Sequence, residues 1–217
     1  GPLSVLRLRT PRLELRPVDD ELSDALCRLA DRGIHPSDEM PFQVPWTRTP
    51  LPRRHWESRQ FYWRCWADLR PPRWELPLAP VAGGGPGRMP GVGARDFAST
   101  RTVGSGSWIG RAHQGRGLGT EMRQAMLHLA FAGLGAEVAE SGAWADNAAS
   151  QRVSEKCGYV HDGRQPCASD EGRPSVGYRL ERATWQARRR DDVEIVGLAA
   201  ALPLLGLAPG SGEPEPA

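Results

Sequence analysis

Lysine is almost absent from this chain, and no long block of basic residues occurs. Of the 28 lysine and arginine residues only Lys156 is a lysine, and the formal net charge is +2. Acidic and basic residues alternate along the sequence, so no basic block is large enough to follow a phosphate backbone. We therefore expect no nucleic acid as a partner.

Cysteine is scarce, and long apolar runs are missing. The four cysteines show no Cys-x-x-Cys spacing and no neighbouring histidine pair, which argues against a zinc site or a redox dithiol; they are Cys27, Cys65, Cys157 and Cys167. Disulfides are not expected either, because the sequence shows no signal peptide. The longest apolar run, 195–207, is shorter than the roughly 20 residues that span a bilayer. We expect a cytoplasmic protein with no metal and no membrane contact.

The length suits one domain with extensions. We expect an N-terminal extension at 1–9, in which Gly1 and Pro2 resemble a tag-cleavage remnant. The main domain is expected at 10–190. An apolar extension at 191–208 should pack on the body or on a partner subunit, possible in a homodimer, because it is too apolar to stay in water. The Gly-, Pro- and Glu-rich tail at 209–217 should be disordered.

Residue periodicity predicts alternating strands and helices. Polar and apolar alternation predicts strands at 12–16, 74–78, 101–110, 136–144 and 174–181. Helical spacing and capping residues predict helices at 19–32, 51–69, 120–131 and 147–157. Prolines should confine strand 74–78 to a sheet edge or a bulge, and 83–93 should be a long flexible connection. The order of elements indicates an α/β (α+β) fold.

Tryptophans crowd into and just beyond a proline-rich stretch, 36–52; they are Trp46, Trp56, Trp63 and Trp66. Aromatic residues at helical spacing usually belong to a core. A segment of this kind can also close over a substrate.

The most informative stretch lies between a predicted strand and a predicted helix, and reads Arg111-Ala112-His113-Gln114-Gly115-Arg116-Gly117-Leu118-Gly119-Thr120. Glycines at this spacing leave backbone N–H groups free to face an anion, and the start of a helix adds its positive end. A pyrophosphate fits this pattern, because β-carbons would block its approach. A Walker loop would require a lysine, and a Rossmann motif would require Gly-x-Gly-x-x-Gly, so neither of these motifs matches.

Part of this stretch, Gln114-x-x-Gly117-x-Gly119, matches the acyl-CoA signature Gln/Arg-x-x-Gly-x-Gly/Ala of the GNAT (Gcn5-related N-acyltransferase) family. Asn147-x-x-Ser150 follows at the distance usual in the family, and then Lys156-Cys157-Gly158-Tyr159. The opening Thr10-Pro11-Arg12-Leu13-Glu14-Leu15-Arg16 resembles the ribosomal-protein alanine acetyltransferase (RimJ/RimL-like) branch. The resemblance covers about 10–181 and implies a twisted, mostly antiparallel mixed sheet of six to seven strands, about four helices, and two splayed parallel strands.

The resemblance also implies how an acyl-CoA would bind. The splayed strands would be 101–110 and 136–144, with pantetheine held between them by backbone groups of Trp108 and Ile109. The pyrophosphate would be held by amides of the loop, namely those of Gln114, Gly115, Arg116, Gly117, Leu118, Gly119 and Thr120. Asn147 would contact the pantetheine arm, and Ser150 would cap the helix or contact the cofactor. Asn147 can equally be a helix N-cap. Arg111 and Arg116 can pair with CoA phosphates, although exposed arginines are more often ordinary surface charges.

By the same resemblance, the chain would be an acyltransferase that passes acetyl from acetyl-CoA to a primary amine without a covalent enzyme intermediate. Glu140 is the first candidate base, with Glu75 and Asp96 as rivals, and each can also be a plain surface charge. Tyr159 is a candidate general acid, although packing is the commoner role of this position. His113 and Cys157 are interpreted as non-catalytic.

Three alternatives stay open at the level of function. The donor can be succinyl-CoA instead of acetyl-CoA. The acceptor can be a protein N-terminus, a lysine or a small-molecule amine. A non-catalytic CoA-binding sensor or interaction module is the alternative from a different class of function.

Overall fold

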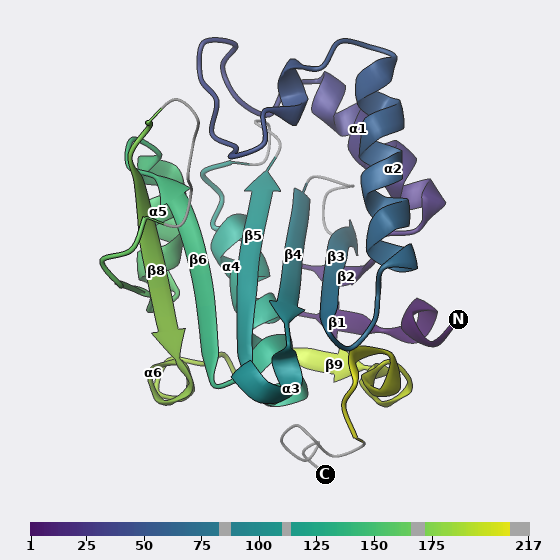
Figure 1. The fold of residues 1–217 in the computed structure, drawn as a ribbon, viewed down its shortest axis with the longest axis vertical. Helices are drawn as coiled ribbons and strands as arrows, with labels where there is room; N and C mark the ends of the chain where they lie inside the picture. Colours follow the sequence, from purple (N-terminus) through teal and green to yellow (C-terminus); the bar gives the residue numbers. More distant parts are fainter. Residues whose placement is uncertain (83–87, 110–113, 166–171, 209–217) are drawn as a thin grey trace.

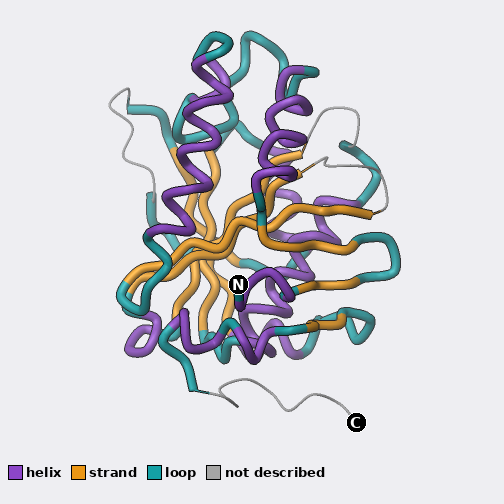
Figure 2. Tube along the Cα trace, turned by 90° about the vertical axis from the view of Figure 1, so that its right-hand side faces the viewer, coloured by secondary structure: helices purple, strands orange, loops and turns teal. Residues whose placement is uncertain are grey.

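The chain forms one mixed, twisted β-sheet with helices on both faces (Figures 1 and 2). The computed structural model describes residues 1–82, 88–109, 114–165 and 172–208. The strand order is β7-β8-β6-β5-β4-β3-β2-β1-β9, and only the β5–β6 pair is parallel. The strands are β1 (Arg7–Arg9), β2 (Glu14–Pro17), β3 (Arg73–Ala82), β4 (Arg88–Arg95), β5 (Thr102–Ile109), β6 (Val138–Trp144), β7 (Val160–His161), β8 (Ser175–Glu181) and β9 (Glu194–Val196).

The helices in the described part of the chain are α1 (Asp20–Asp31), α2 (Arg53–Ala67), α3 (Phe97–Thr100), α4 (Leu118–His128), α5 (Ala148–Lys156) and α6 (Arg182–Gln186). Short helical turns are η1 (Pro2–Val5), η2 (Trp46–Arg48), η4 (Leu129–Gly133), η5 (Leu198–Ala200) and η6 (Leu202–Leu205). The predicted α/β class and the mixed sheet are confirmed. In the described part of the chain the sheet has nine strands, not six or seven. The short strands β1, β7 and β9 have too few residues for a recognisable alternation in the sequence.

The sheet separates two hydrophobic clusters. On one face, Trp74 and Val103 pack against the apolar side of α4, which includes Met122 and Met126. On the other face, α1 and α2 pack together and cover β3 near Ala79. Figure 1 shows α4 behind the sheet and α1 and α2 at its right-hand side. Among the described residues, no helix lies over the middle of the second face, at β4 and β5 (Figure 1).

Strand β3 was predicted at a sheet edge or at a bulge; the edge is wrong, whereas a register shift is found in its pairing with β2. It pairs with both β2 and β4, so it is an interior strand. Its prolines fit for local reasons: Pro80 lies opposite Leu15, beside a register shift in β2, and the carbonyl of Pro77 accepts a hydrogen bond from Val18, just beyond the end of β2. The N–H group that each proline lacks is therefore missing only where the pairing of β3 with β2 is irregular or has ended.

The predicted long connection at 83–93 is also shorter in the structure. Its second half belongs to β4, where Val92 and Ala94 are buried and alternate with Gly91 and Gly93. This is a strand pattern in which glycine occupies the open face. Residues 83–87 lie outside the described part of the chain.

Both ends of the described chain join the same sheet. Residues 1–9, placed outside the main domain by the sequence, form η1 and β1, with Leu3, Leu6 and Leu8 buried. Strand β9 pairs with β1, and the apolar extension buries Leu202 and Leu205 in the main hydrophobic cluster.

The tryptophans of α2 are largely outside the core. Trp56, Trp63 and Trp66 are exposed, whereas the buried face of α2 carries Tyr62 and Cys65. The indole N–H of Trp66 donates to the Val18 carbonyl at 2.8 Å, so its ring lies across the α2–β2 boundary with one side open.

Candidate active site

The two parallel strands separate after a short paired stretch. β5 and β6 pair at three positions, the last being Gly104 with Glu140. Beyond that point β5 continues beside β4 to Ile109, and β6 continues beside β8 to Trp144. The facing backbone edges of the two strands have no strand partner among the described residues, and Trp108 and Ile109 are the last residues of β5 along its edge. An extended ligand can hydrogen-bond to such an edge.

A buried polar cluster lies where the strands separate. Ser105 Oγ donates to the Glu140 carbonyl at 3.3 Å, and Ser141 Oγ donates to the Ser105 carbonyl at 3.2 Å. Arg123, a buried residue of α4, donates from Nη1 to both serine hydroxyls, at 3.3 and 3.2 Å. These side-chain hydrogen bonds take the place of the backbone hydrogen bonds between β5 and β6 at the point where the strand pairing ends. Sequence reasoning missed the cluster, although an arginine on the apolar face of helix 120–131 was an available signal.

Tyr159 belongs to the same cluster. Its hydroxyl lies 2.7 Å from Ser105 Oγ, and only 3% of the residue is exposed. Burial raises the pKa of Tyr159, while the Arg123 charge and the Ser105 hydrogen bond act in the opposite direction. The ring and hydroxyl of Tyr159 therefore lie where β5 and β6 separate, and they help to hold Ser105 in place there.

The glycine-rich loop leads directly into α4. Gln114, Arg116 and Gly117 are exposed, and Gln114 Nε2 donates to the Ile34 carbonyl at 3.1 Å. Gly115 and Gly117 have φ values of 75° and 73°, in the left-handed region that favours glycine. The first helical hydrogen bond is made by the N–H of Glu121.

Within the described residues, the amides of Gly117, Leu118, Gly119 and Thr120 have no intramolecular acceptor. These amides form the positive end of the helix. The arrangement can bind a pyrophosphate.

Asn147 caps α5 and still has a free group. Its Oδ1 accepts the Ser150 N–H at 3.1 Å, so the N-cap interpretation holds. The Nδ2 amino group has no acceptor among the described residues and can donate to a ligand carbonyl. Both Asn147 and Ser150 are half-buried at the end of β6.

Two carboxylates lie on one cross-strand row of the sheet face opposite α4. The register pairs Glu75 with Gly93, Gly93 with Gly104, and Gly104 with Glu140. Gly104 and Gly106 are exposed in the middle of the sheet, so no side chain of the described residues covers the backbone there. With three strand spacings between them, the Glu75 and Glu140 backbones are about 14 Å apart.

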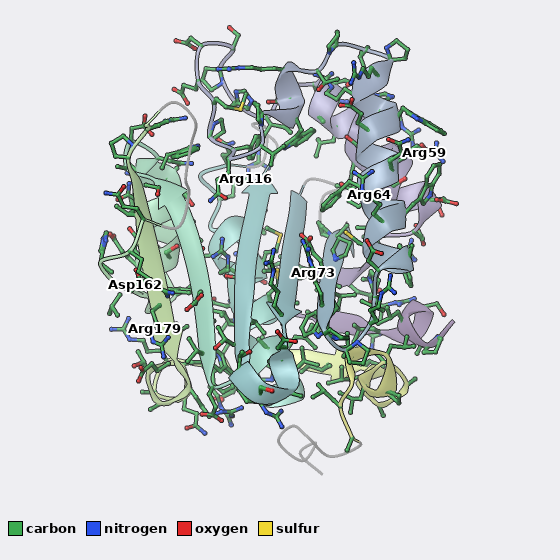
Figure 3. The ribbon with its side chains drawn as sticks, viewed as in Figure 1. Arg59, Arg64, Arg73, Arg116, Asp162 and Arg179 are labelled. Atoms are coloured by element: carbon green, nitrogen blue, oxygen red, sulfur yellow. The ribbon has the colours of Figure 1, made fainter. Side chains whose placement is uncertain are left out.

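The two carboxylates have different partners. Glu140 Oε1 accepts from Arg164 Nη2 at 2.6 Å and lies 3.7 Å from Arg179 Nη1. Figure 3 shows Arg179 and Asp162 along the β8 side of this face. Glu75 leans over β4, with Oε1 3.9 Å from the place where a β-carbon on Gly91 would lie. Although the residue is exposed, its surroundings partly remove water from the carboxylate, which raises the pKa of Glu75; Arg73 opposes this.

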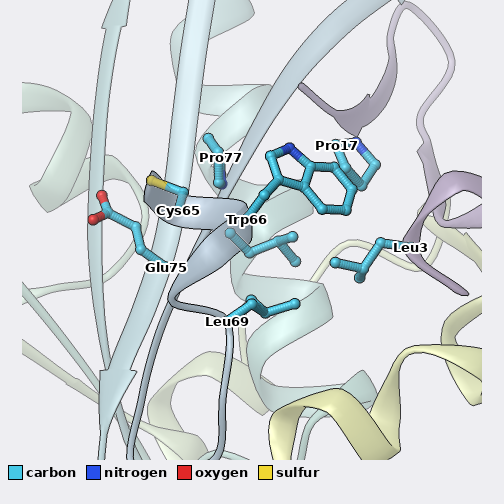
Figure 4. Close-up of a pocket in the computed structure, with 8 residues that line it drawn as sticks. Leu3, Pro17, Cys65, Trp66, Leu69, Glu75 and Pro77 are labelled. Atoms are coloured by element: carbon cyan, nitrogen blue, oxygen red, sulfur yellow. The ribbon is translucent and has the colours of Figure 1, made fainter. Parts of the chain in front are cut away.

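Beside Glu75 the thiol of Cys65 is buried, which raises the pKa of Cys65 to about 12. Figure 4 shows the pocket where α2 packs on β3; the Glu75 carboxylate lies near Cys65 and points away from Leu3 and Trp66. The pocket is a crevice between packed side chains, so it is not the acyl-CoA site.

The remaining sequence candidates lie apart from the strand divergence or outside the described residues. Asp96 is exposed at the turn before α3, at the end of β4 remote from the glycine-rich loop. Arg111 and His113 fall outside the described residues. Cys157 is buried against α4, with Sγ 4.0 Å from the Thr120 carbonyl.

In the described ranges, no cluster of His, Cys, Asp and Glu side chains is arranged to hold a metal ion. No helix found there is long and apolar enough to cross a membrane.

Comparisons with known proteins agree with this geometry. The family model for the acetyltransferase (GNAT) domain matches residues 12–160. Among solved structures, RimJ of Mycobacterium smegmatis in complex with CoA-disulfide is 20% identical, with a TM-score of 0.68 over 88% of this chain and 95% of that one. RimL, the ribosomal L7/L12 alpha-N-protein acetyltransferase in complex with coenzyme A, is 15% identical, with a TM-score of 0.64 over 79% and 95%.

The microcin C7 self-immunity acetyltransferase MccE, in complex with acetyl-CoA and AMP, is 14% identical, with a TM-score of 0.60 over 79% and 93%. Identities this low establish a common fold, whereas the family match covers more than half of the chain. The chain therefore belongs to the GNAT acetyltransferase family.

Proposed function

We propose that this protein transfers acetyl from acetyl-CoA to a primary amine by direct attack of the amine on the thioester. The observation that carries this proposal is the junction of β5 with α4. Free amides at the start of α4 lie at the end of a strand whose edge has separated from its neighbour. A pyrophosphate and an extended pantetheine arm need these two features side by side.

The open sheet face over Gly104 and Gly106 is the proposed approach for the acceptor. Among the described residues the opposite face is filled by α4 and its core, which leaves the open side for the approach of an amine to the strand divergence. Exposed glycines let the acceptor lie close to the backbone. The acceptor must lose a proton before it can attack.

For the proton acceptor, Glu75 is favoured over Glu140. Glu140 is nearer to the divergence, but Arg164 and Arg179 already engage its carboxylate in ion pairs. Glu75 has no ion pair within 4 Å among the described residues, and its raised pKa suits a general base. Its carboxylate, over β4, would act through intervening water. Glu140 stays the rival candidate.

Donor and acceptor identity are open parts of the proposal. Acetyl-CoA is the first choice of donor, with succinyl-CoA as the alternative. RimL is described as an α-N-protein acetyltransferase, which supports testing a protein N-terminus first, before lysine and small-molecule amines. A homodimer and a cytoplasmic location also remain predictions.

Thiol release from acetyl-CoA and succinyl-CoA in the presence of each acceptor class tests the proposal. We expect amine-dependent release with acetyl-CoA and a mass increase of one acetyl group on the acceptor. CoA binding without turnover on any acceptor would favour the non-catalytic sensor. If neither acetyl-CoA nor succinyl-CoA binds, both the transferase and the non-catalytic sensor are ruled out.

A further inference from the structure

A hairpin turn remote in sequence contacts the glycine-rich loop. The turn between β1 and β2 brings Arg12 against the start of α4, where Arg12 Nη1 donates to the Arg116 carbonyl at 3.1 Å. Arg12 Nη2 lies 3.7 Å from the position that a β-carbon on Gly117 would occupy. One guanidinium thus touches the part of the loop with left-handed backbone.

A buried carboxylate holds this guanidinium in place. Glu121, in the first turn of α4, is only 2% exposed. Its Oε2 accepts from Arg12 Nε at 2.6 Å and also contacts Nη2. Its Oε1 accepts from Thr10 Oγ1 at 2.6 Å and from the Arg12 backbone N–H at 3.3 Å.

Glu121 is held in its ionised form. Burial disfavours its charge, but hydrogen bonds from Thr10 and Arg12 and the charges of Arg12 and Arg190 outweigh burial, so the pKa of Glu121 lies below its ordinary value. A charged partner that accepts from two N–H groups of a guanidinium fixes its orientation more strictly than a neutral one. Arg12 therefore presents its remaining N–H groups to the loop in one geometry.

Peptide geometry links this contact to ligand binding. In a planar trans peptide, the carbonyl and the next N–H point in opposite directions. Because Arg12 draws the Arg116 carbonyl toward the hairpin, the N–H of Gly117 points away from it. That N–H is the first of the amides without an acceptor at the start of α4.

We propose that Arg12, held by Glu121, is a positioning residue for the acyl donor: it fixes the Arg116–Gly117 peptide so that the loop amides face the donor's pyrophosphate. The proposal rests on the proposed function, because it assumes an acyl-CoA at this loop. The Arg12 side chain is 51% exposed, so its charge also remains available to the phosphates.

A purely structural tie between the hairpin and α4 is the competing explanation. Thr10 and the Arg12 backbone already bind Glu121, and they suffice for such a tie. The additional contact of Nη1 with the loop carbonyl is what a positioning role requires. The two explanations differ in what substitutions do to donor affinity in a folded protein.

Calorimetric titration of CoA into the whole chain tests the proposal, with Arg12→Lys, Arg12→Ala and Arg9→Ala beside the wild type. Lysine keeps the charge but cannot bridge Glu121 and the carbonyl. We expect both Arg12 variants to raise the Kd at least about tenfold, or ~1.4 kcal/mol. Arg9 lies in the same hairpin and pairs with Glu14 and Glu194, so Arg9→Ala should bind like the wild type. If Arg12→Lys binds CoA as tightly as the wild type, the charge of Arg12 alone is sufficient, and the proposed positioning role is wrong.

In Glu121→Gln, the direction of the change in CoA affinity depends on the mechanism. Removing a negative charge near an anion site strengthens anion binding if electrostatics alone acts. Loss of the Arg12 anchor weakens it. We expect weaker CoA binding, a higher KM for acetyl-CoA and a kcat within about twofold of wild type. Equal or tighter binding by a variant that is still folded at the temperature of the titration would overturn the proposal.

These experiments separate the two levels of inference. A wild type that binds no CoA would remove the proposed function itself. A wild type that binds CoA, with Arg12 variants that match it, would remove only the role of Arg12.

Discussion

The proposed donor side and the proposed acceptor side of this protein are built in different ways. The donor side consists of backbone: free amides at the start of α4 and the unpaired edge of β5. The acceptor side is a glycine-lined sheet face with carboxylates at its two flanks. Backbone recognition requires glycines at fixed spacing and therefore leaves a motif. Side-chain recognition draws single residues from separate strands and leaves none.

The substitution with the largest expected effect on catalysis lies on the acceptor side. Glu75→Gln should lower kcat by about a hundredfold or more, because general-base catalysis typically contributes that much. In the wild type, kcat/KM should fall as the pH drops through the raised pKa of Glu75, and this acidic limb should disappear in Glu75→Gln. Steady-state pH profiles measure both. A larger loss in Glu140→Gln, at an unchanged fold, would transfer the role to Glu140.

On the donor side, Glu121→Gln should cost stability. Its folded-state pKa is lowered, so the charged form contributes stability that is present above the ordinary carboxyl pKa of 4.5 and is lost as the pH falls through the folded value. We expect the variant to be less stable at neutral pH by about 1–3 kcal/mol. Denaturant melts at several pH values should show this difference shrinking below pH 4.5. A difference that does not change with pH would contradict a charged Glu121.

Gly106 offers a steric test of the open face. A β-carbon added there meets no atom within 4 Å, so a side chain should be tolerated by the fold. We expect Gly106→Val to raise the acceptor KM about tenfold, ~1.4 kcal/mol, while the Kd for CoA is unchanged. Gly106→Ala is the graded control and should have a smaller effect. If the valine variant loses only CoA affinity, the acceptor does not approach over this face.

The smallest effect is expected for Tyr159→Phe, which removes only the hydroxyl bonded to Ser105. Loss of one hydrogen bond should reduce the free energy of unfolding by ~1 kcal/mol. We expect kcat to fall by less than about tenfold, because the ring still packs at the divergence. A fall of a hundredfold or more at full CoA affinity would make Tyr159 a general acid.

The sequence predicts the donor side better than the acceptor side. The order strand, glycine-rich turn, helix is local, and the structure reproduces it from β5 to α4. The prolines of β3 suggest either an edge strand or a bulge, and the choice between the two requires the irregular pairing with β2, which the sequence does not show. The contact of Arg12 with the loop joins residues more than 100 positions apart, and no periodicity carries that information.

The acceptor face could not be predicted from the sequence, because it too is formed by residues that are distant in the chain. Gly91 and Gly93 look like part of a flexible connection until the register places them beside the exposed glycines of β5. The arginine partners of Glu140 come from β8 and from the loop before it, so a sequence scan shows Glu140 as free when it is not.

The most direct test of the central claim is calorimetric titration of acetyl-CoA into the wild type, Gly117→Asp and Gly117→Asn. Both substitutions meet the same left-handed backbone, which Asn and Asp tolerate better than most residues, and they differ mainly in charge. We expect binding by the wild type, weaker binding by Gly117→Asn, and the weakest by Gly117→Asp, because its carboxylate adds a negative charge beside the amides that would bind the pyrophosphate. Equal affinity of the Asp and Asn variants, or no binding by the wild type, would contradict a pyrophosphate site at the start of α4.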